Sequence, residues 1–168
     1  MPALDRLRQF FAAMGQWKVE RREALLATLP LWLSDDNAIV RQKLRARATK
    51  RITPWLTQIV DQGVREGVFT TRYPDQVGRL LIGLGHDVNE VLFPLLFADR
   101  GDSGGLLQVE RTLAAYTDAL ERLLGAPEGS LAALVNRDQL QLWFDAAHEQ
   151  AHYSDDANVK GKNDDRVH

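Results

Sequence analysis

The 168-residue sequence contains no cysteine, which excludes disulfide bonds and thiolate-ligated metal sites. It also lacks any apolar run near the roughly 18 residues that a membrane-spanning helix requires. Basic and acidic residues almost balance, with a formal net charge of −2, so the chain has no overall attraction for phosphate backbones. These absences favour a protein of the reducing cytoplasm that does not bind nucleic acid by itself.

Strand signals and internal repeats are missing too, and what remains is helical periodicity. Apolar residues make up 45% of the chain and charged residues 26%, which is typical of one globular domain. The spacing predicts an all-α bundle of about six to seven helices within residues 1–151. The predicted helices are 3–18, 20–33, 36–66, 75–98, 106–124 and 136–151. Residues 152–168 contain few apolar side chains and predict a disordered tail.

Two segments interrupt this pattern. Pro54 lies inside the long helix 36–66, where it removes a backbone donor and disfavours helical geometry at Thr53. We therefore expect a kink or a two-helix break around residues 50–54. The glycine content of residues 100–105 predicts a loop between the helices 75–98 and 106–124.

Residues 61–69, Asp-Gln-Gly-Val-Arg-Glu-Gly-Val-Phe, are followed by Tyr73-Pro74-Asp75-Gln76 and are expected to end one helix and begin the next. This stretch resembles the carboxy-terminal, ligand-sensing part of the tetracycline-repressor (TetR) family of bacterial regulators. Family members often have a G-x-x-x-G-V/I-F ending followed by D-P-x-x-x-A/G. The resemblance extends over about residues 2–135. It implies a helical bundle of the TetR carboxy-terminal type, with one additional helix after the last.

The resemblance also implies a function. Such a domain binds a small, largely apolar effector without a cofactor and pairs with a second copy of itself. In an intact repressor, the effector favours one arrangement of the dimer and thereby releases the operator. Family members begin with a three-helix DNA-reading module, and nothing resembling it precedes the first helix here. We therefore expect contact with DNA only through an amino-terminal module absent from this chain.

Four residues are candidate ligand contacts. Trp32 and Trp55 fall on the elements that line the cavity in the family, although tryptophans are more often part of the core. His86 and Asn89 interrupt the apolar pattern of helix 75–98. They either orient a ligand in an apolar cavity or satisfy internal hydrogen bonds.

Glycines inside helix 75–98 suggest a close helix contact, because each costs up to ~1 kcal/mol relative to alanine. In the family, this helix and the next pack against their two-fold copies as a four-helix interface. The resemblance therefore implies a homodimer interface that includes Gly78, Gly85, Leu92, Leu113, Tyr116 and Leu120. The alternative is a helical homodimer that only mediates interactions and binds no ligand.

His148-Glu149-Gln150-Ala151-His152 has the H-E-x-x-H spacing of zinc proteases. A catalytic zinc needs a third protein ligand, and the remaining sixteen residues offer only a few aspartates and His168. No strand that could align a peptide is predicted either. We therefore expect no enzyme and no metal site, with a zinc-dependent hydrolase as the third alternative.

The third predicted helix has a run of basic residues uninterrupted by acidic ones. Because their positions wind around the helix, we interpret them as a solvated surface. The run comprises Arg41, Lys43, Arg45, Arg47, Lys50 and Arg51.

Overall fold

The computed structural model describes residues 1–98, 103–147 and 149. The elements in these ranges are α1 (Ala3–Glu20), α2 (Arg22–Leu33), α3 (Ala38–Arg65), α4 (Pro74–Ala98) and α5 (Ser103–Leu124), with short 3₁₀ helices η1 (Asp35–Asn37) and η2 (Ala132–Leu134). Residues 137–147 are also α-helical, and no residue in the described ranges lies in a strand. The prediction of an all-α bundle with six to seven helices is therefore confirmed. The predicted tail, 152–168, lies outside the described residues.

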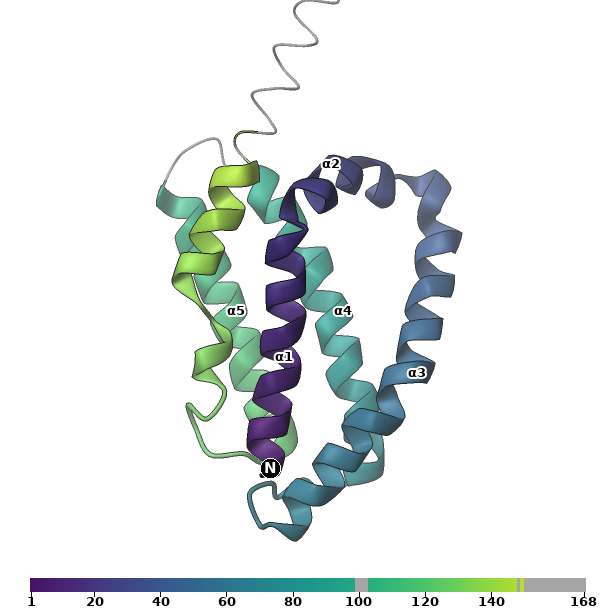
Figure 1. The fold of residues 1–168 in the computed structure, drawn as a ribbon, viewed down its shortest axis with the longest axis vertical. Coiled ribbons are helices and arrows are strands. Elements are labelled where there is room, and N and C mark those ends of the chain that lie inside the picture. The colour runs from purple at the N-terminus through teal and green to yellow at the C-terminus, as the bar shows by residue number, and fades with distance from the viewer. Residues whose placement is uncertain (99–102, 148, 150–168) are drawn as a thin grey trace, which may run out of the picture.

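The helices pack around α1, which runs through the middle of the bundle (Figure 1). Helix α5 and the helix 137–147 lie on one side of it, and α3 lies on the other. Helix α4 lies behind α1, and α2 crosses one end of the bundle to connect α1 with α3. Within the described residues, no helix is both long and apolar enough to cross a membrane.

Helix α3 continues through Pro54 without a break, so the predicted two-helix division is wrong. The helix bends along its length, as the kink alternative expected (Figure 1). Its second half packs closely on α4 at Gly78, where an added Cβ would lie 2.4 Å from Thr57 Oγ1 and 2.9 Å from the Thr53 carbonyl oxygen. This contact on both sides of Pro54 explains why losing one amide donor does not end the helix.

The end of α3 is where the sequence predicts it. Gly67 has a φ of +71°, in the left-handed region that favours glycine. The Val68 amide donates to the Gly63 carbonyl at 2.9 Å, and the Gly67 amide donates to the Val64 carbonyl at 3.1 Å. These two bonds form a Schellman motif, which satisfies carbonyl groups that the helix end leaves free.

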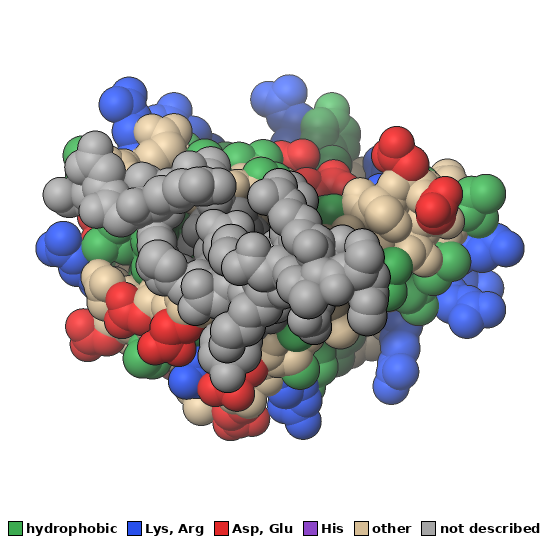
Figure 2. Space-filling view, turned by 90° about the horizontal axis from the view of Figure 1, so that it is seen from above, with side chains coloured by type: hydrophobic (Ala, Val, Ile, Leu, Met, Phe, Trp, Pro, Cys, Tyr) green, Lys and Arg blue, Asp and Glu red, His purple; other side chains and the backbone are tan. Residues whose placement is uncertain are grey.

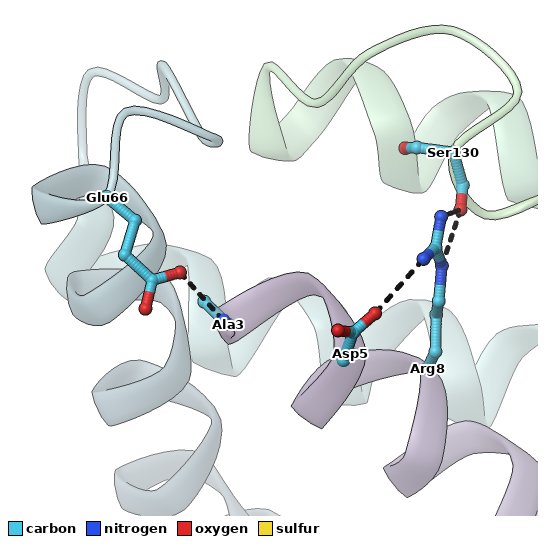
Figure 3. Close-up of polar contacts among 5 residues, drawn as sticks. All are labelled: Ala3, Asp5, Arg8, Glu66 and Ser130. Carbon is cyan, nitrogen blue, oxygen red and sulfur yellow. Dashed lines mark hydrogen bonds and ion pairs between the residues drawn. The ribbon is translucent and has the colours of Figure 1, made fainter. Parts of the chain in front are cut away.

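The start of α1 is fixed to two other parts of the chain (Figure 3). The Ala3 amide donates to the Glu66 carboxylate at the end of α3, at 2.8 Å. The Arg8 guanidinium donates to the Ser130 carbonyl at 2.9 and 2.7 Å and pairs with Asp5 at 3.2 Å. The amino-terminal end of α1 is therefore tied both to α3 and to the loop after α5.

Buried apolar side chains form two separate clusters. The first joins the start of α1, the second half of α3, the first half of α4 and the end of α5; it includes Leu7, Leu56, Ile59, Phe69, Leu81, Leu120 and Leu124. The second joins α2, the first half of α5 and the helix 137–147; it includes Leu26, Val109, Trp143, Phe144 and Ala147. The space between these clusters is where the candidate site lies.

The basic run on α3 lies mostly in solvent. Lys43, Arg47, Lys50 and Arg51 are exposed, whereas Arg45 pairs with Glu90 of α4. Figure 2 shows Lys and Arg side chains at several places around the rim of the molecule rather than in one patch. The structure therefore agrees with the prediction of a solvated surface.

Candidate functional site

A cavity of ≈ 240 Å³ lies between α1, α4, α5 and residues 134–143. Its wall includes Leu81 and Leu120 from the first apolar cluster, and Val109 and Trp143 from the second. The cavity therefore occupies the space that the two clusters leave between them.

Most of the cavity wall is apolar. Helix α1 contributes Phe11, Met14 and Val19, and α4 contributes Leu81, Leu84, Val88, Leu92 and Phe93. Helix α5 contributes Val109, Leu113 and Leu120, and the last part of the wall is Leu134, Val135, Leu140 and Trp143. An apolar hollow with a few polar groups is the usual form of a small-molecule site.

The polar part of the wall centres on Lys18 of α1 and Asn89 of α4. The Lys18 ammonium donates to Asn89 Oδ1 at 2.6 Å, and Asn89 Nδ2 donates to the Gly85 carbonyl one turn earlier. Burial lowers the pKa of Lys18 from its ordinary value of 10.5, because an apolar environment disfavours the charged form. The site therefore holds a cation in surroundings that do not favour it.

A second polar contact joins α4 to α5 at the cavity wall. Tyr116 is a wall residue, and its hydroxyl donates a hydrogen bond to the carboxylate of Asp87, which does not line the cavity. This bond raises the pKa of Tyr116, because the carboxylate accepts a proton that the phenolate would lack. Tyr116 therefore acts as a neutral hydrogen-bonding group at neutral pH.

A groove continues from the cavity between α1 and residues 133–139. The cavity and the groove share Phe11, Gly15, Leu134, Asn136 and Gln139 as wall residues. Gly15 lies in the wall that the cavity and the groove share. A Cβ added at Gly15 would contact only Gln139 Oε1, at 3.7 Å. The groove therefore adjoins the cavity and is lined by both polar and apolar side chains.

The structure does not bring the four predicted ligand residues together. Asn89 lines the cavity, but Trp32 lies in a separate surface hollow beside Phe93, between α2 and α4. Trp55 packs against Phe10, with ring centroids 4.9 Å apart. Which side of an amphipathic helix faces a cavity depends on its neighbours, and spacing alone does not show this.

His86, the remaining predicted residue, lies between α3 and α4. Its Nε2 is 3.5 Å from Thr49 Oγ1. Burial, and next the charge of Arg45, hold the pKa of His86 below its ordinary 6.5, with Lys18 acting in the same direction and Glu90 against it. His86 therefore favours its neutral form between the two helices.

Five of the six predicted interface residues line the same cavity. They are Gly85 and Leu92 of α4 and Leu113, Tyr116 and Leu120 of α5. The sixth, Gly78, is buried against α3 of its own chain, which provides the close helix approach that its sequence position suggested. The outward side of the α4–α5 pair consists of other residues.

Lys18 was not among the predicted site residues, although the sequence pattern contained a signal for it. Phe11, Met14 and Lys18 share one face of α1 by their spacing of three and four residues. A lysine on an apolar face needs an explanation, because lysines rarely turn toward a core.

The H-E-x-x-H pair cannot be placed, since His148 and His152 lie outside the described residues. Among the residues that the structure does describe, no group of three or more His, Asp or Glu side chains could hold a metal ion.

The fold and its cavity define the class of protein: an all-α helical bundle with a largely apolar cavity between its helices. Residues 32–95, which run from the end of α2 through α3 into α4, match the family model described as tetracyclin repressor-like, C-terminal domain. Over this stretch the chain is similar to TetR-like carboxy-terminal domains. No curated protein and no solved structure matches the chain.

Proposed function

We propose that this domain senses a small, largely apolar effector and forms a homodimer, as part of a TetR-type transcription regulator of the cytoplasm. The cavity between α1, α4, α5 and residues 134–143 is the observation that carries the proposal. Its volume of ≈ 240 Å³ lies just below the roughly 300–1,000 Å³ of common ligand pockets, so it suits a small effector.

Helix α1 connects the cavity with the rest of a regulator. Phe11, Met14 and Lys18 belong to the cavity wall, while Ala3 and Arg8 at the other end bond to α3 and to the loop after α5. An effector that binds better to one position of α1 shifts the population toward that position. In an intact regulator, α1 passes this shift to the preceding DNA-reading module.

The outward side of α4 and α5 suits a two-fold contact. Leu80, Gly83 and Val91 of α4 and Leu107, Ala114 and Ala115 of α5 are exposed. Small and apolar residues along two adjacent helices allow a second copy to pack closely as a four-helix interface.

Light scattering after size-exclusion chromatography tests this interface. The wild type is expected to elute as a dimer and the double variant Val91→Arg, Leu107→Arg as a monomer. Ile39→Arg is the control, because Ile39 is as exposed as Leu107, at 66%, but lies on α3. A wild-type monomer at high concentration contradicts the proposal, as does an unchanged dimer in the double variant.

Titration with the neutral fluorescent probe N-phenyl-1-naphthylamine tests the cavity. The wild type is expected to bind the probe with enhanced probe fluorescence. Leu113→Trp fills the cavity and should abolish binding, whereas Leu142→Trp adds the same bulk at an exposed position and should not. Binding that persists in Leu113→Trp places the probe elsewhere and contradicts the proposed site.

A homodimer that mediates interactions without a ligand is the second candidate. Exposed apolar side chains on α2 and α3, among them Leu31, Ile39 and Val40, favour it, since such side chains commonly mark contact surfaces. A wild-type protein that dimerises but binds no apolar compound would support this candidate over effector sensing.

A further inference from the structure

Among the described residues that line the cavity, Lys18 is the only charged one. Its ammonium donates to one neutral partner, Asn89 Oδ1, and forms no ion pair with any carboxylate in the described ranges. An ammonium has three donor positions, so two remain for another acceptor. A half-buried cation beside an apolar wall lacks the compensating charge that such groups normally have.

The two carboxylates on this part of α4 both have partners. Glu90 pairs with Arg45, and Asp87 accepts the hydrogen bond from Tyr116. His86, which precedes both carboxylates on α4, favours its neutral form because burial, and next the positive charge of Arg45 with a smaller contribution from Lys18, lowers its pKa. Lys18 and Arg45 together balance Asp87 and Glu90 in charge, but both carboxylates bond to other groups, so no carboxylate in the described ranges pairs directly with Lys18.

On the basis of the proposed function, we infer that the effector is an organic carboxylate with an apolar body, whose carboxylate binds Lys18 while the body fills the cavity. The apolar wall from Leu84, Leu113 and Trp143 accommodates a hydrocarbon or aromatic group. One ammonium and one amide match a monoanion, whereas a phosphate dianion would need more donors than this wall presents.

A pair of compounds that share a chain length tests the inference: octanoate and 1-octanol, titrated by calorimetry at neutral pH. The wild type is expected to bind octanoate about tenfold to a hundredfold more tightly, as for a hydrogen bond between two charged groups. Lys18→Met should remove this preference while 1-octanol binding remains. Lys18→Arg should keep most of the preference.

Lys43→Met is the matched control, because it removes the same charge from an exposed position on α3. It should leave both affinities unchanged. Circular dichroism establishes that each variant is folded. If Lys18→Met does not fold, the wild type still decides the question, since its octanoate affinity should fall as the pH rises and Lys18 loses its proton, whereas the 1-octanol affinity should not.

The outcomes separate the inference from the proposed function. Equal binding of the two compounds, with no effect of Lys18→Met, overturns the carboxylate and leaves an apolar effector site. If wild-type protein binds neither compound, both fail. Loss of octanoate preference in Lys43→Met as well as in Lys18→Met would show a general charge effect and would also overturn the inference.

Discussion

The ring of Phe69 lies directly against the backbone of Gly63, so that an added Cβ at Gly63 would be 2.0 Å from Phe69 Cδ2 and 2.4 Å from Cε2. Phe69 is only 1% exposed and belongs to the first apolar cluster. Its amide donates to the Gly63 carbonyl at 3.1 Å, which holds the ring in place over the last turns of α3. The first glycine of the G-x-x-x-G-V-F motif thus makes room for the phenylalanine, and the second ends the helix.

Gly63→Ala is therefore expected to lower the free energy of unfolding by about 2 kcal/mol, because Phe69 must leave its site. Urea unfolding followed by circular dichroism measures the change. Gly15→Ala is the control: its Cβ meets only an ordinary contact at 3.7 Å, and alanine should stabilise the helix interior by up to ~1 kcal/mol. Equal effects at the two positions would contradict the packing explanation.

Helix α3 and its neighbours show how much of this fold the sequence predicts. Helical spacing and the Gly67 stop place the helices, because both are local properties of the chain. Pro54 was expected to kink α3 or to divide it; the helix bends but is not divided, and Gly78 of α4 packs on Thr53 and Thr57 on either side of the proline. Ser103 was expected in a loop and begins α5 instead. These differences depend on packing between segments, which helical spacing does not encode.

The candidate site was harder to predict than the fold. Spacing shows that Leu92, Leu113 and Tyr116 are on apolar helix faces, but not whether a face meets a cavity or a second copy. In the structure these three residues line the cavity. Lys18 is the opposite case. The sequence shows that it lies on an apolar helix face, but only the packing of the neighbouring helices shows that this face lines a cavity.

Acidification should loosen the contact between α1 and α3. The hydrogen bond from the Ala3 amide, and next that from Gln62, lower the pKa of Glu66 from its ordinary 4.5. A carboxylate with a lowered pKa stabilises the fold above 4.5, and this contribution is lost as the pH falls through the folded-state pKa. Melting temperatures measured down through this range should fall less steeply in Glu66→Gln than in the wild type. Parallel curves would show that Glu66 makes no contribution.

Glu121 holds the turn that follows α5. Its side chain is buried, with 6% exposed, and accepts the amides of Gly129 at 2.9 Å and Leu131 at 2.7 Å. Glu121→Ala leaves both amides without this acceptor and should cost about 3 kcal/mol, as measured by urea unfolding. Glu128→Ala, an exposed change in the same turn, should stay within about 0.5 kcal/mol of the wild type. A small effect of Glu121→Ala would mean that water replaces the carboxylate.

Lys18 should make the empty domain more stable as the pH rises. Because burial lowers its pKa in the folded state, the unfolded chain binds more protons at pH values between that folded pKa and 10.5. Stability therefore rises with pH across this window. Other groups titrate there as well, including Tyr116, whose raised pKa acts in the opposite direction. The quantity to measure is the difference in unfolding free energy between the wild type and Lys18→Met, compared with the same difference for Lys43→Met.

The first difference should grow in favour of the wild type toward pH 10.5, while the second stays flat. Saturating octanoate should reduce the growth, because a bound carboxylate favours the charged ammonium and brings the folded pKa back up. A pH-independent difference for Lys18→Met without ligand would show that the ammonium is as well solvated in the fold as in the unfolded chain. In that case the Lys18 ammonium would not need a counter-ion, and the cavity would have no preference for a carboxylate over a neutral compound.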